Sequence, residues 1–259
     1  MATAFIEGVL KNGLTKPENI YVSARKKTTL EKLNQLYKVN YSLSNLEVAK
    51  QGEVVVLSVK PQNLKEVFRD LKGIFTADQI ILSIVAGAGL SMLESGFSHN
   101  KIVRSMPNTP AMIGKGITLW TASTYLKEEE LELIKKIFQA IGTEIYVDDE
   151  TYVDMATAVS GTGPSYTFLF IESFTDAAVH LGFPRELAKE LVLKTLSGSV
   201  ALASESTKHP AELKNMVTSP GGTSAEALYQ LEKEGFRTAI SKAIWAAYQK
   251  TLFLKEKID

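Results

Sequence analysis

Cysteine is absent from this chain of 259 residues, and histidine occurs only three times, at His99, His180 and His209. Without thiols the protein has no disulfide, no thiol nucleophile and no zinc site built on thiolates. The three histidines are widely spaced, whereas the ligands of a histidine metal centre are usually clustered. We therefore expect no metal site.

An excess of charge of either sign is also missing, since 29 Lys and Arg residues balance 29 Asp and Glu residues. This balance argues against nucleic acid or an anionic membrane as a partner held by bulk charge, but permits a small anion at one local site. The longest mostly apolar stretch, Gln79–Leu90, is too short to span a bilayer. Met1 leads directly into an amphipathic helical pattern and not into a signal peptide. We expect a cytoplasmic protein.

The first 150 residues alternate between helical and strand patterns, which is typical of a doubly wound α/β domain. Glu53–Val59 and Gln79–Val85 are continuous apolar runs, the pattern of parallel strands covered on both faces. From Thr151 onward only helical patterns follow, and Ser165–Leu181 is apolar almost all round, as in a helix buried by a large core or a partner subunit. We predict an α/β domain at 1–150 and an all-α domain at 151–259. Further strands are expected at 20–24, near Val39 and at 101–105, and helices at 2–12, 28–37, 44–51 and from Pro61.

The first helical pattern comes earlier than in most dinucleotide-binding domains. Such a domain normally opens with a strand and a G-x-G-x-x-G turn that lead into this helix. That strand is central in the sheet, so a sheet without it would expose the edges of two neighbours and lose the backbone cradle for a pyrophosphate. Either an internal start or a truncation would account for the pattern. We expect this chain to bind NADPH more weakly than a version extended by these elements.

Polar residues follow three of the predicted strands, where ligands bind in open α/β sheets. NAD-binding proteins usually place an acidic residue after the second strand, but Ser23–Lys27 (SARKK) offers a hydroxyl and a basic cluster. This composition suits the 2′-phosphate of NADP, with a solvated basic loop as the alternative. The other two loops, Ser58–Pro61 and Ser105–Pro110, are either ligand loops or plain turns.

The stretch Ser219–Ser224 (SPGGTS) precedes a helical pattern at 225–234. Helix N-termini carry unpaired N–H groups and suit anions, and glycines allow a close approach of the backbone. The alternative is an ordinary helix start in which Thr223 or Ser224 is the cap. His209, before Pro210, is expected to cap another helix.

Four motifs together resemble the pyrroline-5-carboxylate reductase family over Met1–Leu254. They are VKP at 59–61, MPNTP at 106–110, SGTGPSY at 160–166 and HPAELKNMVTSPGGTS at 209–224. The resemblance implies a Rossmann domain and a helical dimerisation domain. It implies hydride transfer from NADPH, with NADH possible, to the C=N carbon of Δ1-pyrroline-5-carboxylate, which yields L-proline. It also implies a homodimer, in many members a decamer of five dimers, with an active site shared between subunits.

The same resemblance implies roles for individual residues. Ser219, Pro220, Gly221, Gly222 and Thr223 would hold the substrate carboxylate. Ser224 stands where the family usually has threonine, whose hydroxyl bonds the ring nitrogen, so Ser224 and Thr223 are the expected catalytic residues. The expected cofactor-binding residues are Ser23, Arg25, Asn45 (near the adenosine), Ser58, Val59, Lys60, Pro61, Ala86, Gly87 and Asn108.

Three alternatives stay open at this stage. A β-hydroxyacid dehydrogenase would use a lysine and an asparagine on one helix face, but Lys214 and Asn215 are adjacent in sequence. A reductase-like protein with impaired cofactor binding would act as a metabolite- or nucleotide-binding regulator. A purely structural module is the third alternative.

Overall fold

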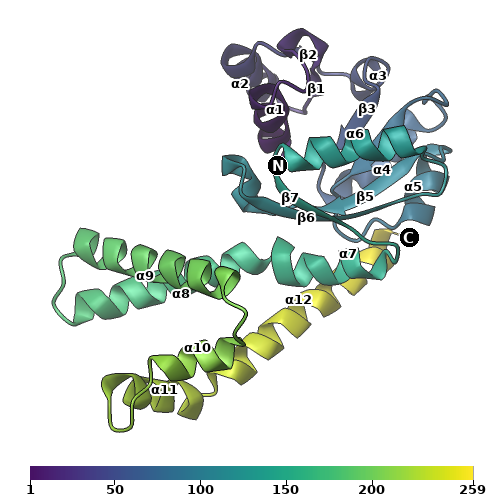
Figure 1. Ribbon diagram of the computed structural model, residues 1–259. Coiled ribbons are helices and arrows are strands. Elements are labelled where there is room, and N and C mark those ends of the chain that lie inside the picture. Colours follow the sequence, from purple (N-terminus) through teal and green to yellow (C-terminus); the bar gives the residue numbers. More distant parts are fainter. Residues whose placement is uncertain (259) are drawn as a thin grey trace. The chain divides into compact units, whose positions relative to one another are not determined.

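The computed structural model describes residues 1–258 and divides into two compact units. The α/β unit comprises Met1–Pro164 and Ala246–Asp259, and the helical unit comprises Ser165–Trp245 (Figure 1). The last helix of the chain therefore contributes residues to both units. The functional boundary near residue 150 stays a prediction.

A five-stranded sheet forms the centre of the α/β unit, in the order β3 (Val54–Leu57), β4 (Ile80–Ser83), β5 (Ile102–Met106), β6 (Gly116–Ala122) and β7 (Gly142–Tyr146). The first three strands are parallel, as the apolar runs predict. No strand was expected from the sequence at β6 or β7, and β6 runs antiparallel to β5. Only the short 3₁₀ helix η3 (Thr109–Ile113) connects β5 to β6. A parallel return would need a longer crossover, so the chain reverses instead.

Two further strands, β1 (Tyr21–Ser23) and β2 (Asn40–Ser42), pair in parallel as a separate sheet. Within residues 1–258 no strand ladder joins β1 to β3. Val54, Val55 and Val56 of β3 are accordingly only half-buried, whereas every residue of β4 and β5 is buried. The continuous apolar run at β3 predicted full burial, and that prediction is wrong because one edge of the strand lacks a neighbour. Within the described residues, one edge of β1 and one edge of β3 are therefore unpaired.

Helices cover both faces of the five-stranded sheet because successive strand residues point to opposite sides. Ile80 and Leu82 of β4 pack with Phe5 and Phe138 in one core cluster, whereas Ile81 packs in the other. The helices of this part are α1 (Ala2–Lys11), α2 (Lys27–Tyr37), α3 (Asn45–Ala49), α4 (Leu64–Leu71), α5 (Leu90–Phe97) and α6 (Glu128–Gln139), with the 3₁₀ helices η1 (Pro17–Asn19) and η2 (Pro61–Asn63). The predicted doubly wound architecture is confirmed.

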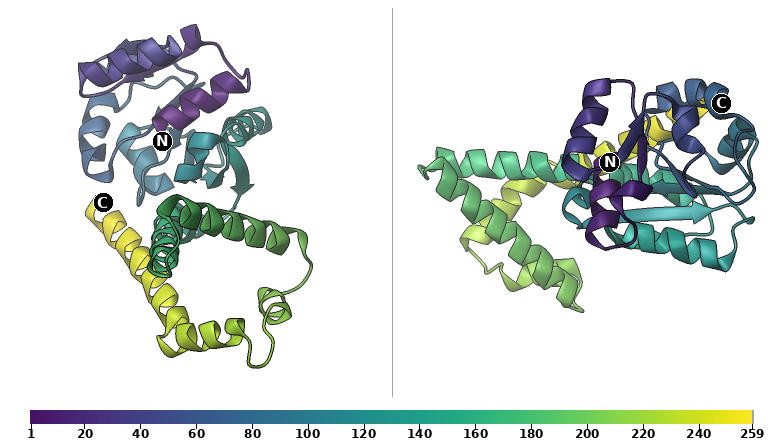
Figure 2. Two further views of the ribbon diagram at one scale, coloured as in Figure 1. Left: turned by 90° about the vertical axis from the view of Figure 1, so that its left-hand side faces the viewer. Right: turned by 90° about the horizontal axis from the view of Figure 1, so that it is seen from above.

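From residue 151 to the end of the described chain the structure is helical, as predicted. The elements are α7 (Thr151–Ala156), the π-helix η4 (Thr157–Gly161), α8 (Gly163–His180), α9 (Arg185–Glu205), α10 (Pro210–Met216), α11 (Thr223–Lys233) and α12 (Phe236–Ile258). A short turn reverses the chain between α8 and α9 (Figures 1 and 2). Among residues 1–258, no helix combines the length and apolar character needed to cross a membrane.

A partly buried ion pair fixes the start of α6 and gives a testable dependence on pH. Lys101 Nζ lies 2.6 Å from Glu130 Oε1, and the same carboxylate accepts a hydrogen bond from the Lys127 N–H. Burial raises the pKa of Glu130, but the hydrogen bonds from Lys101 and Lys127 outweigh burial and hold the pKa below its ordinary value of 4.5. Ionised Glu130 therefore stabilises the fold fully at pH values above its ordinary pKa, and this contribution is lost as the pH falls through the lowered pKa.

We expect Glu130→Gln to lower the free energy of unfolding at neutral pH by about 1 kcal/mol. The difference from the unchanged protein should begin to shrink as the pH falls below the ordinary glutamate pKa, and it should vanish below the lowered pKa, where both proteins carry a neutral side chain. Urea denaturation at several pH values measures this difference. A difference of the same size at acidic and neutral pH would show that the charge of Glu130 does not stabilise α6.

Candidate active site

The loops singled out in the α/β unit lie at one edge of the sheet. Leu57 of β3 is paired with Ser83 of β4, and Ser83 is paired in turn with Arg104 of β5. The residues that follow these three strands therefore emerge side by side. They are Ser58, Val59, Lys60 and Pro61 after β3, Ala86 and Gly87 after β4, and Asn108 after β5.

Contacts also join the end of β1 to this edge. The Ser23 hydroxyl donates to Asn45 Oδ1 at 2.9 Å, which links β1 to the first residue of α3. Arg25 Nη2 donates to Glu66 Oε2 of α4 at 3.1 Å, and both side chains are exposed. Since α4 follows the loop that contains Lys60, the predicted residues after β1 and β3 are brought together.

Several polar groups at this edge are available to a ligand. Ser58 and Lys60 are exposed, and Lys60 forms no ion pair with any residue in 1–258. Asn108 accepts a hydrogen bond from the Ile117 N–H at 3.0 Å through Oδ1, which fixes the orientation of its side chain. Gly87 is buried and has φ of +78°, a conformation that strongly favours glycine.

The N-terminus of α1 fits a phosphate-containing cofactor. No side chain caps this helix, its first turn has no acidic residue, and the first residues after Met1 are Ala2, Thr3 and Ala4. Its first N–H groups therefore meet neither a competing side chain nor a repelling charge, which suits a pyrophosphate. The exposed cations Arg25, Lys26 and Lys27 add an anion-binding surface beyond β1.

In the helical unit, Ser219–Gly222 forms a tight turn directly before α11. The Gly222 N–H donates to the Ser219 carbonyl at 3.1 Å, and Gly221 has φ of +70°. Gly222 is the N-cap, and no side chain caps the helix. The alternative in which Thr223 or Ser224 is the cap is therefore wrong. These two residues open the helix, and within residues 1–258 neither their N–H groups nor their hydroxyls have a hydrogen-bond partner.

Nothing in Ser219–Ser224 ionises near neutral pH, so this turn can hold an anion or donate hydrogen bonds but cannot act as a strong base. His209 is occupied as a cap, as predicted: its Nδ1 accepts from the Ala211 N–H, and Glu212 accepts from the His209 N–H. Lys214 and Asn215 are consecutive residues of α10 and do not share a helix face. This placement disfavours the catalytic pair of a β-hydroxyacid dehydrogenase.

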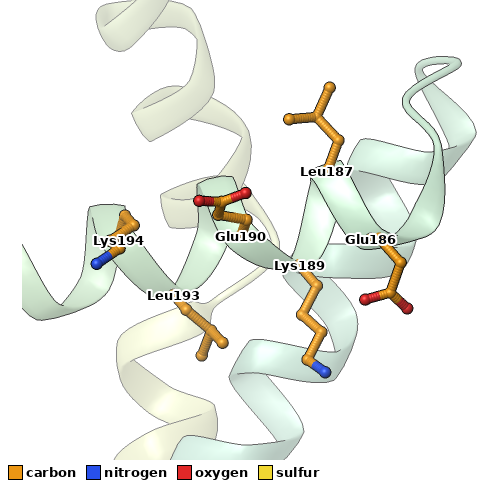
Figure 3. Close-up of a pocket in the computed structure, with 6 residues that line it drawn as sticks. All are labelled: Glu186, Leu187, Lys189, Glu190, Leu193 and Lys194. Atoms are coloured by element: carbon orange, nitrogen blue, oxygen red, sulfur yellow. The ribbon is translucent and has the colours of Figure 1, made fainter.

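A hollow lies along α9, where Figure 3 shows side chains that all come from one helix. They are Glu186, Leu187, Lys189, Glu190, Leu193 and Lys194. None of the predicted site residues lines this hollow, and no second element encloses it. It therefore has no part in the candidate active site.

One polar residue beside the loop after β4 was not expected from the sequence. Glu150 Oε2 accepts a hydrogen bond from the Leu90 N–H at 3.0 Å, just after Ala86–Gly87. Glu150 stands in an acidic run at 148–150 that reads as an ordinary solvated loop, and its partner lies 60 residues earlier. Only the folded chain brings the two together.

Comparisons with known proteins converge on one group. A family model described as pyrroline-5-carboxylate reductase dimerisation matches residues 150–254, and one described as NADP oxidoreductase, coenzyme F420-dependent, matches residues 1–87. A pyrroline-5-carboxylate reductase of Synechocystis is 39% identical over 99% of this chain and 96% of its own length. One from Escherichia coli is 34% identical over 97% of this chain and 93% of its own length. The crystal structure of Plasmodium falciparum pyrroline carboxylate reductase with NADP bound superposes with a TM-score of 0.90 at 33% identity, covering 98% of this chain and 94% of that one.

Proposed function

The chain belongs to the pyrroline-5-carboxylate reductase family, and we propose on that basis that Ser219–Ser224 holds the substrate while the edge of the sheet holds the cofactor. The protein reduces Δ1-pyrroline-5-carboxylate to L-proline with NAD(P)H, the last step of proline biosynthesis. The observation that carries this conclusion is the identity to reductases of this name over nearly the whole chain.

On the substrate side, the unpaired N–H groups of Thr223 and Ser224 bind the carboxylate, together with the hydroxyls of Ser219 and Thr223. Pro220, Gly221 and Gly222 shape the turn so that a small anion can approach its backbone. The Ser224 hydroxyl donates a hydrogen bond toward the ring nitrogen. Imine reduction does not need a strong base, because a protonated or hydrogen-bonded imine is already electrophilic at carbon. Orientation and hydrogen bonding therefore supply the catalysis.

On the cofactor side, the N-terminus of α1 receives the pyrophosphate. Asn45 lies near the adenosine, and Ser23 and Arg25 bind the 2′-phosphate that distinguishes NADPH from NADH. The rest of the dinucleotide is lined by Ser58, Val59, Lys60, Pro61, Ala86, Gly87 and Asn108. The bound cofactor supplies the hydride.

A preference for NADPH can be tested at Arg25. We expect Arg25→Ala to raise the KM for NADPH about tenfold, because a charge-assisted contact with the 2′-phosphate is lost, and to leave the KM for NADH unchanged. Arg69→Ala removes another exposed arginine, from α4, and serves as the control. Initial rates with each cofactor measure both constants. Equal changes for NADPH and NADH would show that Arg25 does not contact the 2′-phosphate.

The helical unit has the surface expected of a subunit interface. Its long helices expose large apolar side chains, namely Phe168, Leu169, Phe170 and Phe174 on α8 and Leu187, Leu191, Val200 and Leu202 on α9. Exposed apolar area on this scale normally marks an interaction site, and the chain self-associates through this dimerisation domain. We place the helical domain at 151–259 and the cofactor domain at 1–150. We further propose a decamer of five dimers and a cytoplasmic location.

Oxidation of NADPH, followed spectrophotometrically, tests the function. We expect turnover with Δ1-pyrroline-5-carboxylate, and no reduction of NAD in the presence of small hydroxyacids. Turnover with hydroxyacids would favour a β-hydroxyacid dehydrogenase. Binding of nucleotide without turnover of either substrate would favour a regulatory protein.

A further inference from the structure

A partly buried cluster of four charged residues lies in the α/β unit outside every role assigned above. The Arg104 side chain of β5 is 1% exposed and pairs with Asp154 of α7, which is 3% exposed. Arg104 Nη1 also lies 3.4 Å from Glu150 Oε2. Lys255 of α12 completes the cluster, with Nζ 3.4 Å from Asp154 Oδ2 and 3.8 Å from Glu150 Oε1. Two cations and two carboxylates thus join β5, α7 and α12.

This cluster reaches the loop after β4 through Glu150. The helix α5 begins after Gly89, which has no side chain with which to cap it. Glu150 takes that role from a distant part of the chain, since its Oε2 accepts the hydrogen bond from the Leu90 N–H at 3.0 Å. A carboxylate at a helix N-terminus also interacts favourably with the helix dipole.

The backbone of the same loop is closely packed by residues of the cluster. A Cβ built on Gly87 would lie 3.0 Å from the backbone nitrogen of Lys255, and one on Gly89 would lie 3.4 Å from Glu150 Oε1. Glu94, one turn further along α5, faces the same carboxylate: burial and then the charge of Glu150 raise the pKa of Glu94. Residues 87–94 are therefore held from one side by Glu150 and by the end of α12.

Burial of charge is costly, and an ion pair of this kind is weak evidence for stability alone. The cluster does fix geometry, because each oxygen of the Glu150 and Asp154 carboxylates lies beside Arg104 or Lys255. Arg104 and Lys255 both bind Glu150 and leave its Oε2 aimed at Leu90. A fixed Leu90 N–H in turn fixes the backbone that leads back to Gly87.

We propose that Glu150 is a positioning residue for NAD(P)H: held by Arg104 and Lys255, it caps α5 and keeps the Ala86–Gly87 backbone in the conformation that contacts the cofactor. This role rests on the proposed function only in the assignment of Ala86 and Gly87 to the cofactor site. In this role Glu150 acts through the Leu90 N–H and the backbone before it, and not through a contact of its own with the cofactor. Its loss should therefore weaken cofactor binding more than it slows the chemical step.

The test compares Glu150→Ala and Glu150→Gln with Asp149→Ala in the full chain. Asp149 is adjacent and accepts a hydrogen bond from the Thr151 N–H at 2.9 Å, so its loss disturbs the start of α7 without touching Leu90. Calorimetry gives the Kd of NADPH, steady-state kinetics gives kcat at saturating cofactor, and hydrogen exchange reports on the Leu90 amide.

We expect Glu150→Ala to raise the Kd of NADPH about five- to twentyfold and to speed exchange at Leu90, with kcat within about twofold of the unchanged protein. Glu150→Gln keeps an oxygen acceptor, so its Kd for NADPH should lie between those of Glu150→Ala and the unchanged protein. Asp149→Ala should leave the Kd unchanged. Lys255→Met changes a partly exposed position and should raise the Kd less than Glu150→Ala does. This variant replaces Glu150→Ala in the test if Glu150→Ala does not fold.

An unchanged Kd in folded Glu150→Ala, or an equal rise in Asp149→Ala, would overturn the proposal. A different outcome would separate the two proposals. The unchanged protein has no reductase activity, but Glu150→Ala still speeds exchange of the Leu90 amide and still raises the Kd of NADPH. This result would overturn the proposed function and leave the positioning role intact.

Discussion

Ser224→Ala is expected to lower kcat about 10- to 100-fold and to leave the KM for NADPH and the oligomeric state unchanged. The hydroxyl of Ser224 is the group proposed to donate to the ring nitrogen. A hydrogen bond to a charged group, or to a group on which charge develops, contributes about 1.5–3 kcal/mol. Ser224 lies at the start of α11, and its hydroxyl forms no hydrogen bond within residues 1–258. Its removal should therefore cost the fold little.

Two further variants make this result specific. Ser224→Thr keeps the hydroxyl and installs the residue usual in the family, so its kcat should stay within a few-fold of the unchanged protein. Ser204→Ala removes an exposed hydroxyl that bonds only the Val200 carbonyl within α9, and it should have no kinetic effect. Steady-state kinetics with pyrroline-5-carboxylate measures all three. A Ser224→Ala protein with full turnover would remove Ser224 from the mechanism.

Supplying a parallel strand between β1 and β3, followed by a G-x-G-x-x turn ahead of α1, is expected to strengthen NADPH binding by at least about tenfold. Such a strand would pair with the free edges of β1 and β3 and join the two sheets. The turn would add backbone N–H groups to the uncapped N-terminus of α1, where the pyrophosphate is proposed to bind. The same strand should bury Val55 and Val56 and raise the thermal midpoint.

Calorimetry on the chain of 259 residues and on the version extended ahead of Met1 measures this effect. An extension of equal length in which the turn glycines are replaced by alanine separates the two contributions. It should restore stability without restoring affinity, because only glycine lets the backbone approach the phosphates closely. Equal NADPH affinity with and without the extension would contradict the expected role of this strand.

Local patterns predict the parts of the fold whose causes are local. The apolar runs at β3 and β4 identify parallel strands, and the helix starts at Pro61 and His209 follow from proline and capping chemistry. The antiparallel direction of β6 could not be predicted from its own residues, because it depends on the length of the connection after β5. The half-burial of Val55 depends on the edge of β3 that is unpaired within residues 1–258, and the apolar run of β3 does not reveal this edge.

The candidate site also has one part that can be recognised from local sequence and another that depends on the folded chain. Ser219–Ser224 can be recognised from sequence because proline, glycines and hydroxyls are consecutive and directly precede a helix. The cap that Glu150 provides for α5 could not be recognised, because Glu150 and Leu90 are 60 residues apart and neither position has a distinctive pattern. The cluster with Arg104 and Lys255 likewise depends on three elements that meet only in the folded unit.

The most direct measurement of the central claim is the amount of L-proline formed for each NADPH oxidised by this chain in the presence of Δ1-pyrroline-5-carboxylate. Transfer of one hydride to the imine carbon predicts one proline for each cofactor consumed, and loss of both signals together in Ser224→Ala. NADPH oxidation without proline, or no oxidation by a folded protein that binds both ligands, would contradict the assignment.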